Sequence, residues 1–231
     1  MRYVIWDFDG TLAYREGGWS GACVEVIGRT DATQDIGIDD IRPYLDAGFP
    51  WHTPNEPHTE VEKADEWWER LYPVLESAMT EAGLSPTTAV SLAPRVRETY
   101  LTEHWHLFED VIPTFKSLAN EGWSHLVLSN HVPELEWIID DLGVSGYLDA
   151  VYTSASIGYE KPHPEAFKAV MHTLEADATA CMIGDSVEAD ILGARHLELP
   201  AILVRDDHPE VQYAVENLHE VPALLSAVLD D

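Results

Sequence analysis

Two acidic segments of this 231-residue chain have residue types and spacings that could do chemistry, and each follows a short apolar run. The first is Asp7-Phe8-Asp9-Gly10-Thr11. Two carboxylates at i and i+2 in a turning chain can take different roles, one attacking as a nucleophile and the other donating or accepting a proton. Gly10 permits a close backbone approach and unusual dihedral angles. Asp and Gly are also common turn formers, so this segment alone leaves an ordinary turn open.

The second acidic segment runs from Gly184 to Asp190. Asp185 ends the preceding apolar run, and Asp190 lies in the first turns of a predicted helix, where the Cβ tilt leans it back toward Asp185. If the two apolar runs are neighbouring strands, Asp7, Asp9, Asp185 and Asp190 converge. Carboxylates about 4 Å apart repel by roughly 4 kcal/mol at an effective dielectric of 20. A hard divalent cation such as Mg²⁺ relieves that repulsion. Helix capping, the alternative role for Asp185, does not explain both acids together.

Three further residues fit a site for a phosphate group. Ser129 and Asn130 end another apolar run, where a hydroxyl and backbone N–H groups can hold phosphate oxygens. Lys161 precedes Pro162, which biases it toward an extended backbone that can aim the ammonium group at a fixed point. A lone Ser or Lys is more often a turn or surface residue. Lys161 is, however, one of only four lysines, and it lies between two predicted strands.

Five short apolar runs are predicted to be the strands that position these residues. They are residues 3–6, 126–128, 150–152, 181–183 and 201–204. Helical patterns alternate with them at residues 112–120, 133–141, 164–174 and 187–197. Alternation with right-handed crossovers predicts a doubly wound, Rossmann-like α/β fold around a parallel sheet. In such sheets, sites form at the carboxyl ends of the strands.

More than 100 residues separate the first two predicted strands, far more than one crossover needs. We therefore predict a core domain of residues 1–16 and 106–231, with an all-helical domain of residues 17–105 inserted into it. Residues 60–82 have an amphipathic helical pattern that Pro73 interrupts, residues 47–58 are predicted to be a loop, and no strand is predicted in the insert. Four conspicuous residues either pack the core of the insert or cover a leaving group and exclude water. They are Trp51, His52, Trp67 and Trp68.

Composition and charge exclude several classes of protein. The chain has 42 acidic and 13 basic residues, a net charge of −29, which argues against nucleic-acid partners and anionic membrane surfaces. No apolar run approaches the ~18 residues of a membrane span, and Asp7 and Asp9 do not suit a signal peptide. Cys23 and Cys181 cannot form a disulfide framework, so we expect a cytoplasmic protein. The acids are spread along the chain rather than gathered in a tail, which favours a halophilic surface over that of an ordinary acidic protein.

The four segments, in this order and at these strand ends, resemble the four motifs of the haloacid dehalogenase-like (HAD) hydrolase superfamily. The resemblance covers residues 1–13 and about 106–206, and the insert is similar to that family's helical cap in position and helical character. It implies that Asp7 is the nucleophile, forming an aspartyl-phosphate, and that Asp9 is the general acid and then the base.

The resemblance also implies the remaining roles. Thr11 hydrogen-bonds within its loop and orients Asp9, and the phosphate-binding set is Thr11, Ser129, Asn130 and Lys161. Asp7, the backbone carbonyl of Asp9, and Asp185 hold Mg²⁺, with Asp190 in contact with the metal or just behind it.

The leading hypothesis is a Mg²⁺-dependent phosphatase acting on a small phosphorylated metabolite. A dehalogenase needs neither a general acid nor a metal, because halide leaves unprotonated, so Asp9 and the acidic cluster count against it. A phosphonate hydrolase would need an amine in the insert, whose only lysine, Lys63, lies on the polar side of a predicted helix. A phosphomutase and a non-catalytic phosphate-binding module stay open, and the sequence does not indicate the oligomeric state.

Overall fold

The fold is built on a six-stranded sheet in which every neighbouring pair of strands is parallel. The computed structural model describes residues 1–30, 35–61, 63–206 and 208–229. The strand order is β5-β4-β1-β6-β7-β8. The strands are β1 (Arg2–Trp6), β4 (Trp123–Ser129), β5 (Ala150–Thr153), β6 (Thr179–Gly184), β7 (Ala201–Val204) and β8 (Ala214–Val215). The predicted α/β, Rossmann-like fold and its five strands are confirmed; the two-residue β8 was not predicted.

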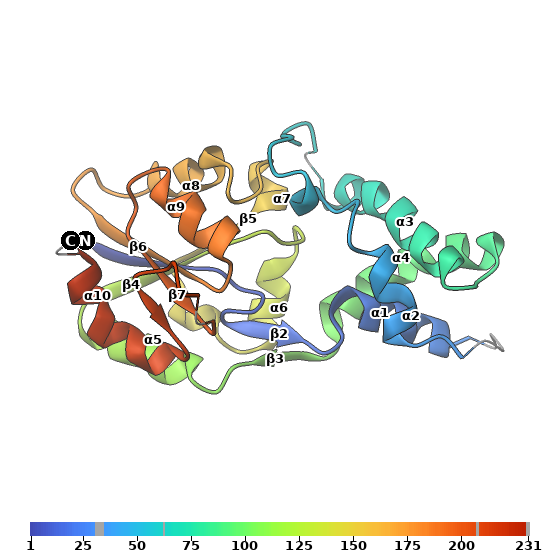
Figure 1. Cartoon of the computed structure of the whole chain (residues 1–231), viewed down its shortest axis with the longest axis horizontal. Coiled ribbons are helices and arrows are strands. Elements are labelled where there is room, and N and C mark those ends of the chain that lie inside the picture. The colour runs from blue at the N-terminus through green and yellow to red at the C-terminus, as the bar shows by residue number, and fades with distance from the viewer. Residues whose placement is uncertain (31–34, 62, 207, 230–231) are drawn as a thin grey trace.

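Helices cover both faces of this sheet (Figure 1). One face carries α8 (Pro164–Met171) and α9 (Gly193–Arg195), and the other carries α5 (Val111–Asn120), α6 (Leu135–Asp141) and α10 (Val221–Leu229). Successive side chains of a strand point to opposite faces. In β1, Ile5 therefore packs in the apolar cluster of Phe167, whereas Val4 and Trp6 pack in the cluster of Phe115.

The predicted helix at residues 187–197 is present, but its first turns are not α-helical. The structure has a π-helical turn, η4 (Val187–Leu192), followed by the short α9. Ser186 caps this turn, because its hydroxyl accepts from the backbone N–H of Ala189 at 3.0 Å while its own N–H donates to Asp190 Oδ2 at 3.0 Å. A Cβ on Gly184 would lie 2.0 Å from that oxygen. The wide turn thus draws Asp190 onto the strand end, a position that only glycine at 184 permits.

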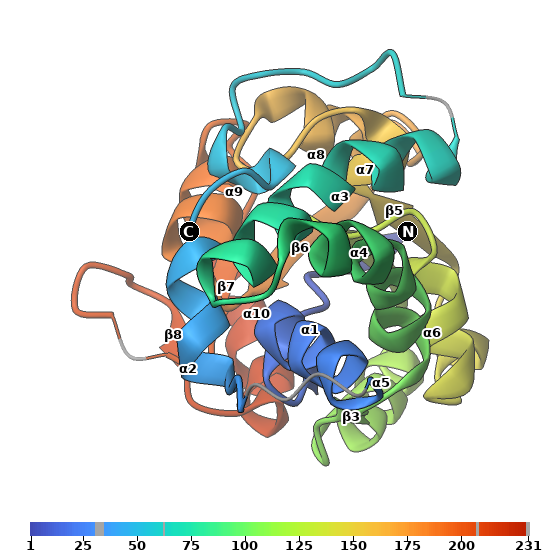
Figure 2. The same cartoon turned by 90° about the vertical axis from the view of Figure 1, so that its right-hand side faces the viewer.

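The segment between β1 and β4 holds a separate group of helices, which faces the viewer in Figure 2. They are α1 (Gly18–Gly28), α2 (Ile38–Ile41), α3 (Ala64–Glu81) and α4 (Pro86–Thr102), with two short 3₁₀ turns, η1 (Arg42–Tyr44) and η2 (Pro50–His52). Helix α3 packs against α4, and α4 packs against α1. Over the described residues, no helix is both long and apolar enough to cross a membrane.

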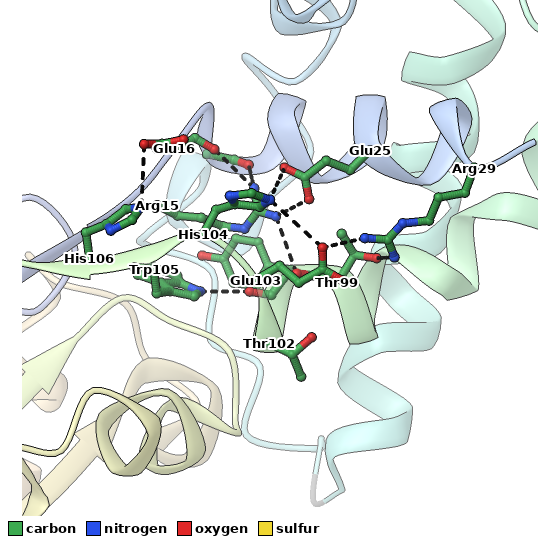
Figure 3. A network of polar contacts seen from close by, with 12 residues as sticks. Arg15, Glu16, Glu25, Arg29, Thr99, Thr102, Glu103, His104, Trp105 and His106 are labelled. Carbon is green, nitrogen blue, oxygen red and sulfur yellow. Dashed lines mark hydrogen bonds and ion pairs between the residues drawn. The ribbon is translucent and has the colours of Figure 1, made fainter.

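A two-stranded antiparallel sheet joins this insert to the core. It pairs β2 (Ala13–Arg15) with β3 (Trp105–Leu107), so the prediction of a strand-free insert is wrong at Trp105. Three-residue strands are too short to show an alternating pattern in sequence. Arg15, the last residue of β2, bonds this joint to two helices of the insert, because its guanidinium donates to Glu25 of α1 at 2.8 Å and to the Thr99 carbonyl of α4 at 3.3 Å (Figure 3).

Candidate active site

Asp7 follows β1 directly and lies between the ends of β4 and β6. Its Oδ1 accepts a hydrogen bond from Ser129 Oγ at 2.8 Å and another from Lys161 Nζ at 2.8 Å. Ser129 is the last residue of β4, which pairs with β1, and this pairing brings the hydroxyl to Asp7. No described residue donates to Asp7 Oδ2. The structure therefore brings together three of the predicted site residues around one carboxylate oxygen.

Lys161 is buried and bridges two carboxylates. Its Nζ lies 2.8 Å from Asp7 Oδ1 and 2.5 Å from Asp190 Oδ1. Burial opposes the charge, but Asp190 and Asp7 outweigh it and raise the pKa of Lys161 above its usual range. The side chain of Asn130 exchanges two hydrogen bonds with the Lys161 backbone at 2.7 and 2.8 Å, so the predicted phosphate contact at Asn130 is left to its backbone N–H. Asn130 thus positions the lysine.

Three carboxylates form a compact acidic cluster. Asp7, Asp185 and Asp190 each offer an oxygen within 4.8 Å of the others. Burial raises the pKa of Asp185 to about 7, and repulsion from Asp7 and Asp190 adds to the rise. Hard oxygen donors that repel one another fit a divalent cation such as Mg²⁺. Asp9 is outside this cluster, in line with its predicted contribution through a backbone carbonyl.

The loop after β1 is shaped around Asp185. Gly10 has a φ of +88°, and a Cβ there would lie 2.3 Å from Asp185 Oδ2. The hydroxyl of Thr11 donates to Asp185 Oδ1 at 3.1 Å. We expected this hydroxyl to bond within its own loop and to orient Asp9, and that expectation is wrong. Thr11 instead holds Asp185, a candidate metal ligand.

Asp9 lines a cavity of about 640 Å³. The side chain is exposed to the space of the cavity, yet the surrounding protein desolvates it. That desolvation, with a smaller contribution from Asp7, raises the pKa of Asp9 to about 7. A carboxyl group with such a pKa can be protonated near neutral pH, as a general acid must be.

Both the core and the insert line this cavity. The core contributes the predicted residues Asp7, Asp9, Ser129, Asn130, Lys161, Asp185 and Asp190. The insert contributes Trp19, Asp46, Trp51, His52, Pro54 and Tyr100. Of the four conspicuous insert residues, Trp51 and His52 line the cavity, whereas Trp67 and Trp68 are buried within the insert, Trp67 beside a second cavity. That second cavity, of about 330 Å³, is lined by insert residues alone, and none of the predicted catalytic, phosphate-binding or metal-binding residues lines it.

The sequence interpretation missed His131, which also lines the cavity. Its ring is buried and packs edge-on against Phe8, with centroids 5.6 Å apart. Neither ring nitrogen has a hydrogen-bond partner among the described residues. Burial lowers the pKa of His131 to about 4, so the ring is neutral at pH 7. Its position in the sequence, directly after Ser129 and Asn130, could have indicated that it lies at the site.

Two buried contacts fix the insert to the core beside the cavity. Glu134, on the core, accepts from the Trp68 indole at 3.1 Å and from the Arg97 guanidinium at 2.5 Å. His58, on the insert, lies 2.9 Å from Glu160, the residue before Lys161. The position of the insert is thus tied to residues next to the site.

Comparison with known proteins decides the family. The model of the haloacid dehalogenase-like hydrolases matches residues 1–197, which is most of the chain. This chain belongs to the haloacid dehalogenase-like hydrolase family. It is 29% identical over 167 residues to haloacid dehalogenase-like hydrolase domain-containing protein 3 of Bos taurus, covering 69% of this chain and 64% of that protein. It is 32% identical over 120 residues to ribulose-1,5-bisphosphate 5-phosphatase of Halopiger xanaduensis, covering 51% of this chain and 50% of that protein.

Solved structures of haloacid dehalogenase-like proteins share the whole fold. The HAD-hydrolase YfnB of Bacillus subtilis, solved with magnesium bound, superposes with a TM-score of 0.74 at 18% identity, over 97% of this chain and 98% of that one. The L-2-haloacid dehalogenase of Xanthobacter autotrophicus superposes with a TM-score of 0.70 at 15% identity, over 97% and 98% of the two chains. At these identities the likeness establishes the fold, and the reaction must be argued from the site.

Proposed function

We propose that this hydrolase is a Mg²⁺-dependent phosphatase that cleaves a small phosphomonoester through an aspartyl-phosphate on Asp7. One observation carries the proposal: Ser129 and Lys161 both donate to Oδ1 of Asp7, and no described residue donates to Oδ2. A carboxylate held in this way keeps one oxygen for attack in a cavity that Asp9 also lines. The relatives whose names state phosphatase activity support the same reaction class.

The chain's own residues supply both half-reactions. Asp7 attacks phosphorus, the ester P–O bond breaks, and Asp9 gives its proton to the departing alkoxide. Asp9, now ionised, takes a proton from water, whose oxygen attacks the phosphorus of the aspartyl-phosphate and releases phosphate and Asp7. Ser129 and Lys161 hold the phosphoryl oxygens, and the Lys161 charge offsets the negative charge gathered there.

Asp7, Asp185 and the backbone carbonyl of Asp9 would hold the Mg²⁺, with Asp190 at its edge. When bound, the metal supplies charge that the phosphoryl transfer needs and orients the phosphate against the nucleophile. Both oxygens of Asp190 already accept hydrogen bonds, from Lys161 and from the Ser186 N–H. Asp190 therefore acts mainly by holding Lys161 and the loop beside the metal.

The insert, residues 17–105, serves as a cap that shapes the leaving-group side of the cavity. Six of its residues line the cavity, and the Glu134 and His58 contacts fix it over the strand ends. With the cap in place, the phosphoryl group is shielded from bulk water, which strengthens the electrostatic effects of Lys161. The cytoplasm is the proposed compartment, and Cys23 and Cys181 are both buried and free.

The deciding experiment measures phosphate release from p-nitrophenyl phosphate and from a panel of phosphorylated metabolites, with Mg²⁺ and with chelator. We expect turnover that chelation abolishes and Mg²⁺ restores, with Ca²⁺ substituting poorly because of its looser coordination. Full activity after exhaustive chelation would contradict the metal assignment. No turnover of any ester would favour a non-catalytic phosphate-binding module. Transfer of phosphate within the substrate, without release, would identify a phosphomutase.

A dehalogenase is the rival within this fold, since such a neighbour shares it. The acidic cluster and the raised pKa of Asp9 favour the phosphatase, because halide departs without a proton and needs no metal. Chloride release from a 2-haloacid in the chelated protein would support the dehalogenase instead. The insert's Lys63 is exposed, pairs with Glu66 and does not line the cavity, so nothing favours a phosphonate hydrolase.

A further inference from the structure

The cavity that leads to Asp7 is poor in positive charge. Lys161 is the only lysine or arginine that lines it among the described residues. All 13 lysines and arginines of the chain fall within that described part. The Lys161 ammonium group is already shared between Asp7 and Asp190. A phosphate group arriving at Asp7 would therefore use all of the lysine charge that the cavity offers.

Arg15, which lies near the cavity, adds no free charge. It is buried against the ring of Tyr100, a residue that lines the cavity, with its guanidinium carbon 5.8 Å from the ring centroid. Its nitrogens donate to Glu25 and to the backbone carbonyls of Glu16, Gly18 and Thr99. Arg15 therefore does not line the cavity, and its guanidinium group is already bonded to groups of the protein.

The two histidines that line the cavity are also uncharged. The Nδ1 of His52 accepts a hydrogen bond from the Phe49 N–H at 3.3 Å, so that nitrogen carries no proton. Burial lowers the pKa of His52, although the nearby Asp46 works against the shift. His131 has no acid bonded to either ring nitrogen that would stabilise a positive charge. Neither ring can therefore neutralise an anionic group on a leaving alcohol.

Two exposed carboxylates face the same space. Asp46 comes from the insert and Glu188 from η4, and both line the cavity. Neither forms an ion pair with a lysine or arginine among the described residues. Two indole rings from the insert, Trp19 and Trp51, complete this side, with centroids 6.1 Å apart. The leaving-group side is thus aromatic and negatively charged.

We propose that the substrate is the phosphomonoester of an uncharged or cationic alcohol, and that a second anionic group on the substrate is rejected. This inference rests on the proposed function. A carboxylate or second phosphate would meet Asp46 and Glu188 without a counter-ion, and like charges brought together in an interface are strongly unfavourable. An ammonium group would instead find two carboxylates and the faces or edges of indole rings. The substrate would then differ in class from the bisphosphate in the name of the Halopiger xanaduensis relative.

The test compares kcat/KM for three esters of similar size and different charge: ethanolamine phosphate, glycerol 2-phosphate and phosphoglycolate. We expect phosphoglycolate to be hydrolysed at least about tenfold less efficiently than both of the others. A smaller difference, or a preference for phosphoglycolate, would overturn the inference and leave the phosphatase intact. If p-nitrophenyl phosphate and all three esters stay intact, the proposed function fails and the inference fails with it.

Charge reversal at the cavity supplies the matched variant. Asp46 is exposed, so Asp46→Lys should fold, which its melting temperature checks. It should raise kcat/KM for phosphoglycolate relative to ethanolamine phosphate by about tenfold or more, because the added ammonium supplies the missing counter-ion. The control is Asp39→Lys, at an exposed acid of the insert that does not line the cavity and that should leave this ratio unchanged. An unchanged ratio in Asp46→Lys would overturn the inference.

Discussion

Lys161 donates to Oδ1 of Asp7 across 2.8 Å, and this contact leaves Oδ2 as the oxygen of Asp7 with no donor among the described residues. Since Ser129 donates to Oδ1 as well, the carboxylate is held by one side only. The arrangement separates the part of Asp7 that is fixed from the part that can react. Changes at Asp7 and at Lys161 should therefore have different effects on activity and on stability.

Asp7→Asn should abolish turnover, because an amide at this position cannot form an acyl-phosphate. The variant keeps the shape of the side chain, so its melting temperature should stay close to that of the parent protein. Phosphate release at saturating Mg²⁺ is the measurement. Turnover at the parent rate would show that the nucleophile is elsewhere.

Lys161→Met should destabilise the protein as well as inactivate it. The change leaves Asp7 and Asp190 close together and buried without their cation, a loss that typically costs about 3–5 kcal/mol. The two carboxyl groups would respond by holding protons, so their pKa values should rise in the variant. An acid whose pKa is raised in the folded protein makes the free energy of unfolding fall as the pH rises toward that pKa. The stability lost by Lys161→Met should therefore be larger at pH 8 than at pH 5. Denaturant titrations at both pH values measure it.

Added Mg²⁺ distinguishes this electrostatic account from simple loss of packing. A cation bound to the same cluster should recover part of the stability of Lys161→Met, without recovering its activity. Lys168→Met is the matched control, since Lys168 is half-exposed and pairs with Glu165 on the surface. That variant should lose at most about 1 kcal/mol at either pH. An equal loss in both variants would contradict the prediction.

The pKa of Asp9, raised to about 7, predicts a pH dependence of the first half-reaction. A group with a raised pKa keeps its proton up to that value, so the general acid is in place below about pH 7 and is lost above it. For an alkyl phosphate, kcat/KM should therefore fall as the pH rises through 7. The fall should be smaller for p-nitrophenyl phosphate, whose leaving group needs no proton.

Asp9→Asn provides the control for this pH profile. It should reduce turnover of the alkyl ester by about 10²–10⁴-fold, and the fall above pH 7 should disappear. Any pH dependence of kcat/KM that the variant retains is due to ionisation of the substrate. A variant with the parent profile would rule out Asp9 as the titrating acid.

The sequence predicted the core sheet and the meeting of its acids because both follow from local pattern. Short apolar runs bounded by Asp, Gly and Ser define parallel strands, and the residues after parallel strands meet at one edge. The role of Asn130 could not be predicted in the same way. Its side chain grips the backbone of Lys161, 31 residues away, and only the assembled fold brings the two together.

The insert was harder to predict for a related reason. Helix α4 begins at Pro86 and contains Pro94, which hides its pattern, although Ser85 does cap it. Tyr100 reaches the cavity only because α4 packs against α1, where Trp19 stacks on its ring at 3.9 Å. Such contacts depend on tertiary packing, and helical periodicity cannot indicate which aromatic side chain faces a cavity.

Arg15→Met should test the joint between core and insert. The Arg15 side chain is 1% exposed and bonds to Glu25 and to several backbone carbonyls, so its loss leaves buried acceptors unpaired. Removing such a partner typically costs about 1–3 kcal/mol for each unsatisfied group. The control is Arg29→Met, because Arg29 is half-exposed in the same network and should contribute at most about 1 kcal/mol. Equal melting temperatures for the two variants would argue against a structural joint at Arg15.

The acid excess predicts how stability depends on salt. Only five acids of the described chain are buried, namely Asp7, Asp110, Glu134, Glu160 and Asp190. The others lie partly or fully exposed, and 13 basic residues cannot pair with 42 acids. Carboxylates at this density repel one another in dilute buffer and destabilise the compact state. We therefore propose that the surface is adapted to concentrated salt.

Screening should remove most of this repulsion, since the Debye length falls to about 3 Å at 1 M salt. Salting-out ions should also strengthen apolar burial. We expect the melting temperature to rise steadily from about 0.1 M to above 1 M KCl at fixed Mg²⁺ and pH. Near the pI of about 4.4 the same salt effect should shrink, because protonated carboxyl groups no longer repel. The proposed catalytic mechanism does not depend on high salt. An active enzyme whose melting temperature does not change with KCl would therefore refute the halophilic surface without contradicting the proposed phosphatase activity.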